Sequence, residues 1–137
     1  MAEVLTRLAA ALPSARVVKD NEWPRRAPAG GWVNLHEGEM DGPPDVDLSP
    51  LRYNWVWPID VELVACPPNP VERHAALDAL ITAVSGMVEA DRQLGGLVEF
   101  LEVEPGATED IQIESGDLGR GGRLTLLAQF STTSPAG

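Results

Sequence analysis

The clearest pattern in the chain is a long alternation of apolar and polar residues between positions 51 and 65. The odd positions from Leu51 to Ala65 are all apolar, and most of the even positions are polar. Successive side chains of a strand point to opposite faces, so this period of two predicts one long strand with one apolar face. Pro58 cannot donate to a strand ladder, so we expect it at an edge, a bulge or a break between two collinear strands.

Two helical patterns accompany this strand. The first covers residues 2–12 and ends at Pro13, and its apolar stripe is formed by Val4, Leu5, Leu8 and Leu12. The second begins after Asn69, a good N-cap, with Pro70 at the first helical position and Glu72 placed to complete a capping box. We expect it to reach about residue 90, with its buried face formed by Leu77, Leu80, Ile81, Val84 and Val88.

Shorter apolar runs predict four further strands, at residues 15–19, 32–36, 97–103 and 123–133. A linker rich in Pro and Gly lies at 23–31, and two polar segments, 37–50 and 104–122, are expected to be long loops. The predicted order is α-β-β-β-α-β-β. It indicates an α+β fold, with two helices packed on a mostly antiparallel sheet in a single domain covering residues 1–137.

The charge of the chain narrows its possible partners. Ten basic and twenty-one acidic residues give a net charge of −11, and Lys19 is the single lysine. Nucleic acids and anionic membranes bind clustered Lys and Arg, so neither is expected as a direct ligand. Since 44% of the residues are apolar, this acidity does not indicate disorder. We also expect no signal peptide and no membrane span, and the single cysteine, Cys66, favours a reducing compartment.

Motifs that carry chemistry are missing from the sequence. It has no phosphate-binding P-loop, and the glycine-rich segment 116–122 precedes a strand instead of a helix. Ser85 lies inside the second predicted helix, where no nucleophile elbow forms. His36 has no nucleophile partner, and it is not at metal-ligand spacing with His74 or Cys66. We therefore expect a non-enzymatic protein without metal or cofactor.

The aromatic residues of the long strand have more than one interpretation. Tyr53, Trp55 and Trp57 could stack against bases, but the chain has too little positive charge for that role. One face of a sheet core is the better account. If these side chains are instead exposed as a cluster, they mark a protein interface.

Several segments, taken in order, point to a family. They are Val4–Pro13, Ala15–Val18, Pro28–Gly38, Leu48–Tyr53, Arg73–Leu80, Asp91–Glu99 and Phe130–Pro135. Over nearly its whole length the chain resembles a family of small proteins of tailed phages, prophages and gene transfer agents, which is similar to the tail terminators of long-tailed particles. The chain departs from the family at Ile113–Arg123, where related chains usually have a basic segment of small residues.

The resemblance implies a structural virion protein. A terminator is expected to form a hexameric ring on the tail tube protein, to stop tube polymerisation, and to join the tail to a head-tail connector protein. Its expected location is the host cytoplasm during assembly and then the head-proximal end of the tail. DNA would pass through the ring without specific binding. We hypothesise that four acidic residues line the lumen of the ring or form an assembly loop: Glu39, Asp41, Asp45 and Asp47. We hypothesise that a second set forms a subunit or partner interface: Trp23, Arg25, Arg26 and Arg120.

Two alternatives stay open from the sequence. One is another neck or tail-completion adaptor with the same fold. The other is an acyl-CoA transferase, because some proteins of this family are described in that way. A transferase would need a basic cleft for CoA, and Lys19, Arg25 and Arg26 are too few and too dispersed to form one.

Overall fold

The computed structural model describes residues 2–13, 15–20, 31–39, 43–48, 50–65, 70–112 and 118–133. Trp23, Arg25, Arg26 and Asp41, four of the candidate site residues, lie outside these ranges, as do Cys66 and Asn69. The elements follow the order α1 (Ala2–Ala11), β1 (Arg16–Lys19), β2 (Trp32–Glu37), β3 (Asp45–Leu48), β4 (Leu51–Ala65), α2 (Pro70–Ala90), the short 3-10 helix η1 (Leu94–Gly96), β5 (Phe100–Gln112) and β6 (Leu118–Thr132).

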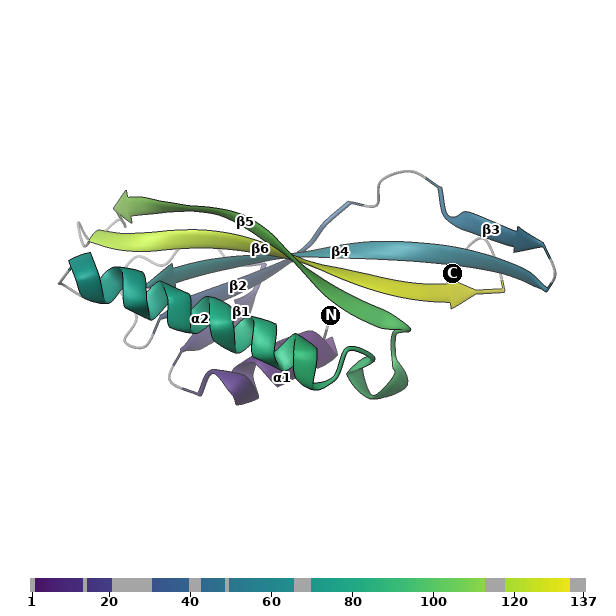
Figure 1. The fold of residues 1–137 in the computed structure, drawn as a ribbon, viewed down its shortest axis with the longest axis horizontal. Coiled ribbons are helices and arrows are strands. Elements are labelled where there is room, and N and C mark those ends of the chain that lie inside the picture. Colours follow the sequence, from purple (N-terminus) through teal and green to yellow (C-terminus); the bar gives the residue numbers. More distant parts are fainter. Residues whose placement is uncertain are drawn as a thin grey trace.

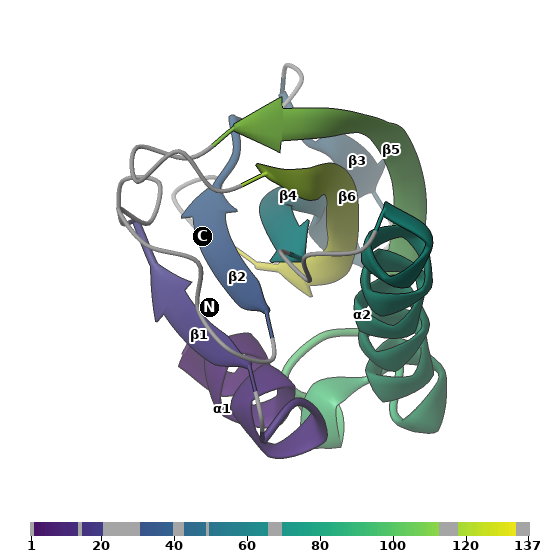
Figure 2. The ribbon, with the colours of Figure 1, turned by 90° about the vertical axis from the view of Figure 1, so that its left-hand side faces the viewer.

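The strands form one six-stranded sheet with the order β1-β2-β4-β6-β5, and β3 pairs with the free part of β4. The β1–β2 pair is parallel and every other pair is antiparallel. Figure 1 shows both helices below one half of this sheet, and the view in Figure 2 places α1 and α2 on neighbouring sides of it. The expected α+β architecture, two helices on a mostly antiparallel sheet, is confirmed.

The core lies between the helices and one face of the sheet. Helix α1 contributes Val4 and Leu8 to this core. Helix α2 contributes its predicted apolar stripe, in which Ile81 is half-buried and the other four residues are buried. The odd residues of β4 from Ile59 to Ala65 face these helices and are at most 4% exposed. Burying a Leu or Val side chain contributes about 1.5–3 kcal/mol, so this half of the sheet carries most of the hydrophobic stabilisation.

The segment 37–50 is not one loop, as the sequence predicted, because it contains β3. Val46 pairs with Tyr53 and Leu48 pairs with Leu51, which makes β3 and β4 a hairpin. Val46 and Leu48 alternate with Asp45 and Asp47. The alternation was present in the sequence, but it spans only four residues beside prolines and carboxylates, which are depleted in strands.

The prediction of a loop at 104–122 was wrong for residues 104–112 and 118–122, while residues 113–117 lie outside the described ranges. β5 continues to Gln112, and β6 begins at Leu118 instead of Arg123. Glu, Gly and Pro have low strand propensity, yet β6 pairs with β4 without interruption from Tyr53 to Ala65. Pairing along so long a neighbour outweighs local propensity. The irregularity that these residues do introduce is a register shift between Pro105 and Thr108.

Pro58 lies inside β4, at a place where one side of that strand is free of a strand partner. β2 ends opposite Ile59 and β3 begins opposite Asn54, so neither reaches Pro58. The Gly38 N–H donates to the Pro58 carbonyl over 2.9 Å, which shows that this carbonyl points to the β2 side. The N and O of one residue face the same neighbour in an antiparallel ladder, so the missing N–H also faces the gap. Of the three positions expected for Pro58, an edge, a bulge or a break, the structure shows a local edge within an unbroken strand.

Candidate assembly surface

The sheet is longer than the helices that cover it. A helix rises about 1.5 Å per residue and a strand about 3.3 Å, so the 21 residues of α2 span roughly 32 Å and the 15 residues of β4 roughly 50 Å. In Figure 1, β3, the first half of β4 and the end of β6 extend past both helices. We call this part, residues 45–48, 51–57 and 128–132, the arm.

One face of the arm is apolar and continues the core face of the sheet. The register places Tyr53, Trp55 and Trp57 of β4 opposite Thr132, Phe130 and Ala128 of β6. On the other side, Val46 and Leu48 lie opposite Tyr53 and Leu51. Trp55 and Phe130 are stacked, with ring centroids 6.4 Å apart, and the Trp55 Nε1–H donates to Thr132 Oγ1 over 2.9 Å. The arm face is therefore formed by Val46, Leu48, Leu51, Tyr53, Trp55, Trp57, Ala128 and Phe130.

Much of the arm face is open to solvent. Leu48 is 82% exposed, and Val46 and Leu51 are each 48% exposed. Its three β4 aromatics and Phe130 are half-buried. The largest apolar patch on a protein surface is often an interaction site. The sequence could have located the arm face by comparing the length of the alternating strand with the length of the helices.

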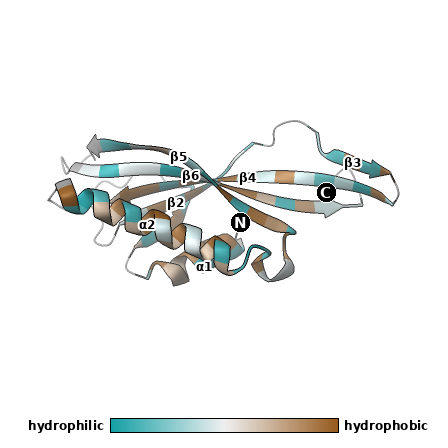
Figure 3. Ribbon diagram, in the orientation of Figure 1, coloured by the Kyte–Doolittle hydropathy of each residue, from teal (hydrophilic) through white to brown (hydrophobic). Residues whose placement is uncertain are grey.

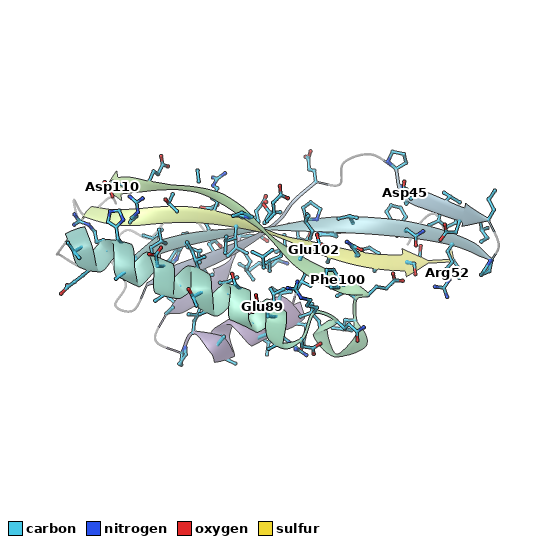
Figure 4. The ribbon with its side chains drawn as sticks, in the orientation of Figure 1. Asp45, Arg52, Glu89, Phe100, Glu102 and Asp110 are labelled. Carbon is cyan, nitrogen blue, oxygen red and sulfur yellow. The ribbon has the colours of Figure 1, made fainter. Side chains whose placement is uncertain are left out.

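The opposite face of the arm is mainly polar. It carries two carboxylates of the candidate lumen set, Asp45 and Asp47, both exposed. Asn54 Nδ2 donates to Asp47 Oδ2 over 3.0 Å, and the Ser131 hydroxyl donates to the Glu99 carboxylate. Val56, which is 48% exposed, is the apolar exception. The structure thus places Asp45 and Asp47 on the same strand of the arm, and Figure 4 labels Asp45 there. Glu39 is also exposed, but it lies just after β2 and outside the arm.

Arg120, the described member of the candidate interface set, makes contacts within its own chain. Its Nη1 lies 3.1 Å from Asp110 Oδ1, and its Nη2 donates to Thr108 Oγ1 over 3.0 Å. Only 20% of its side chain is exposed. These contacts join β6 to β5, so Arg120 has a role in the fold of this edge.

A polar cluster lies on the face of the sheet away from the helices. His36 Nδ1 is 3.3 Å from Asp20 Oδ1, and His36 Nε2 is 2.8 Å from Glu62 Oε1. The fully buried Asn34 places its Nδ2 2.9 Å from the same Nε2. Within the described residues these partners of His36 are two carboxylates and an amide, none of them a hydroxyl or thiol. The cluster connects β1, β2 and β4 and provides no nucleophile for acyl transfer.

A groove of about 630 Å³ lies between α2 and β5. Figure 4 shows Glu89, Phe100 and Glu102 around this region. Arg92 lies over the Phe100 ring, 5.1 Å from its centroid, and donates to the Leu101 carbonyl over 3.0 Å. Two carboxylates beside a single, already engaged guanidinium do not form a phosphate site. The groove therefore lacks the basic lining that CoA requires.

The outer face of α2 carries a row of small, mainly apolar residues, which the sequence prediction did not consider. Residues spaced by three or four positions share one side of a helix. The small or apolar residues exposed along this side, which we call the helix stripe, are Val71, Ala75, Ala79, Thr82, Gly86 and Ala90, and the exposed Glu72 and Glu89 lie at its two edges. Val71 is 76% exposed. Figure 3 shows hydrophobic, neutral and hydrophilic colours alternating along α2.

The described residues contain no group of three or more His, Cys, Asp or Glu side chains placed to hold a metal ion. None of the helices described is both long and apolar enough to cross a bilayer.

No protein-family model matches the chain, and no curated protein is significantly similar to it. Among solved structures, the chain is similar to one from the "Virion of native gene transfer agent (GTA) particle". The two are 19% identical, the match covers 96% of this chain and 93% of that chain, and the TM-score is 0.48.

Proposed function

We propose that this protein is a structural component of a phage-like particle, and specifically the tail terminator. In this role a hexameric ring of the protein caps the tail tube, stops its polymerisation and joins the tail to the head connector. The protein is not an enzyme in this proposal, and it uses no cofactor.

The arm face is the observation that carries the proposal. It is an apolar surface built from regular, paired strands, so it is available without refolding. A protein with an open apolar surface on a projecting sheet is suited to bind other proteins. A ring needs two different complementary patches on each subunit, and the chain offers two candidates, the arm face and the helix stripe.

The sequence motifs and the charge support the same role. The sequence segments from Val4–Pro13 to Phe130–Pro135, taken in chain order, resemble the tail terminator family over nearly the whole chain. The net charge of −11 disfavours binding to DNA, which suits a ring through which DNA has to slide. The α2–β5 groove lacks the basic residues that would favour a CoA-dependent enzyme.

The position of the protein in purified particles tests this proposal. A gold-labelled C-terminal tag, viewed by electron microscopy, is expected at the head-proximal end of the tail tube. Particles with the tag on the major tail tube protein provide the control, with label along the whole tube. Label at the baseplate, or none on the particle, would refute the proposal.

Tail length separates a terminator from a neck adaptor. If the protein stops polymerisation, cells without its gene should accumulate tubes of irregular and excessive length. If it acts as an adaptor after the tube is complete, tubes of normal length should accumulate without heads. The second result would replace the terminator assignment with the adaptor.

A further inference from the structure

We propose that the arm face of one subunit packs on the helix stripe of a second copy of this chain. This contact would be the subunit interface of the proposed ring, so the inference rests on the proposed function. The arm face of each subunit therefore binds another copy of the chain, and it contacts helix α2 of that copy.

The two surfaces differ in a way that makes them complementary. The arm face presents large side chains, among them Trp55, Trp57 and Leu48, on a pleated sheet surface. Apart from Val71, the helix stripe presents alanines, one glycine and one threonine, which allow another backbone or a bulky side chain to approach closely. Their lengths also agree. Residues 51–57 span roughly 23 Å of strand, and residues 71–90 span roughly 30 Å of helix.

Gly86 provides an independent reason to place a partner on the stripe. It lies inside α2, where glycine is less favourable than alanine because it loses more backbone freedom on folding. A Cβ atom built at this position meets no atom within 4 Å, so nothing within the described residues requires a glycine there. A close neighbour from outside the chain supplies that requirement.

The size of the surfaces favours a ring over a dimer. The arm face has eight residues and the helix stripe six, fewer than the roughly 20–30 residues that each partner contributes to a standard interface. One arm-to-stripe contact is thus smaller than a stable dimer needs. Every subunit of a closed ring makes two such contacts, one with each surface, so it buries about twice the area that a single contact buries. Like-charge repulsion from the −11 net charge opposes self-association of either kind in dilute solution, so we expect the contact to form on a tail-tube template or at high salt.

Cysteine crosslinking between two populations of the protein tests the contact. All variants carry Cys66→Ser, so the native thiol does not react. One population carries Leu51→Cys and a tag that changes its size, and the other carries Thr82→Cys, a change at an exposed position in the middle of the stripe. Under mild oxidation, with tail tube as the template or at high protein and salt concentration, we expect a crosslinked species of one tagged and one untagged chain. A disulfide requires Cα atoms about 5.5–6 Å apart, so its formation reports direct contact.

Val56→Cys is the matched control for Leu51→Cys. Both side chains are 48% exposed on the same arm, but they lie on its opposite faces. Val56→Cys should not crosslink to Thr82→Cys. Equal crosslinking from the two faces would overturn the proposal. Crosslinks predominantly between two Leu51→Cys chains would also overturn it, because they indicate that two arms pair with each other.

Self-association provides a second measurement. Leu48→Asp places a charge on the arm face at a side chain that is 82% exposed, so the fold and thermal unfolding should be unchanged. Sedimentation should show association weakened about tenfold or more. Val56→Asp is the control and should associate as the parent does. Unchanged association of Leu48→Asp would count against the arm as the docking surface.

The outcomes for the contact and for the proposed function are distinguishable. Six-fold rings at the end of the tube that lack the crosslink between positions 51 and 82 refute this contact and leave the terminator role intact. Crosslinked copies that never occur at the end of the tube support the contact and refute the terminator role.

Discussion

Arg7 Nη1 lies 2.9 Å from Asp91 Oδ2, and this ion pair connects α1 to the turn that follows α2. Arg7 also binds Glu3 one helical turn earlier, with 2.8 Å between Nε and Oε1. Asp91 in turn accepts the backbone N–H groups of Gly95, over 2.9 Å, and of Gln93, over 3.2 Å. One carboxylate therefore holds both the turn and the first helix.

These contacts predict a pH-dependent contribution to stability. Hydrogen bonds from the Gly95 backbone and from Arg7 hold the pKa of Asp91 below its ordinary value of 3.8. Since the folded pKa is the lower one, the carboxylate stabilises the fold above pH 3.8, and this contribution is lost as the pH falls through the folded pKa. Asp91→Asn should lower the melting temperature at neutral pH, and its difference from the parent should shrink in acid.

Thermal unfolding between about pH 2 and pH 7 measures this effect. Asp78→Asn, a change at an exposed carboxylate of α2, is the control and should leave the acid dependence of the parent intact. A melting temperature difference for Asp91→Asn that stays constant over the whole range would show that the pairing does not contribute through ionisation.

Two glycines should respond in opposite directions to replacement by alanine. A Cβ atom at Gly106, in the irregular part of β5, would stand 2.5 Å from the Arg123 carbonyl oxygen. Gly106→Ala should therefore lower the free energy of unfolding by about 1–3 kcal/mol. Gly86→Ala meets open space and should raise that free energy in the monomer by about 0.5–1 kcal/mol. Urea denaturation of both variants measures the signs, and equal signs would contradict this account.

The elements with a clear hydrophobic period, two in a strand or about 3.6 in a helix, were mostly predicted correctly from the sequence. The bounds expected for β4 agree with the structure, and the buried stripe of α2 was correct in four of its five positions. These segments combine a clear period with a clear end, such as Pro70 at the start of α2. Hydrophobic burial then selects the same structure that the local pattern favours.

The errors arose where pairing partners decide the structure. Residues 104–112 contain Glu104, Pro105 and Gly106, which do not indicate a strand, yet β6 lies beside them over the whole length of β5. The exposure of the arm face has a similar origin. An alternating pattern predicts an apolar face, but whether that face is covered depends on how far the helices reach along it.

Hydrogen exchange distinguishes strand from loop at this edge. β6 lies between β4 and β5, so the amides of 118–122 that bond to either neighbour should exchange slowly. Amides of β5 that donate to β6 should also be protected, while those of the short, exposed β3 exchange faster. Exchange throughout 104–112 as fast as in an unfolded peptide would support the loop that the sequence predicted.

The final prediction concerns the acidic residues and the passage of DNA. DNA phosphates adhere to basic surfaces and slide past acidic ones, so carboxylates in the lumen of a terminator ring would ease ejection. Asp45 and Asp47 are exposed on the polar face of the arm, and Glu39 is exposed after β2, which leaves all three accessible for this role.

If the protein is the proposed terminator, replacing Glu39, Asp41, Asp45 and Asp47 by Lys should give particles with tails of normal length that eject DNA more slowly. Salt screens charges over about 10 Å at 0.1 M, so the defect should shrink as the salt concentration rises. Ejection measured by release of a DNA-binding dye, together with tail lengths measured by electron microscopy, separates the possibilities. Failed assembly with normal ejection in the few complete particles would make these residues an assembly contact, and no change in either would leave them a solvated surface.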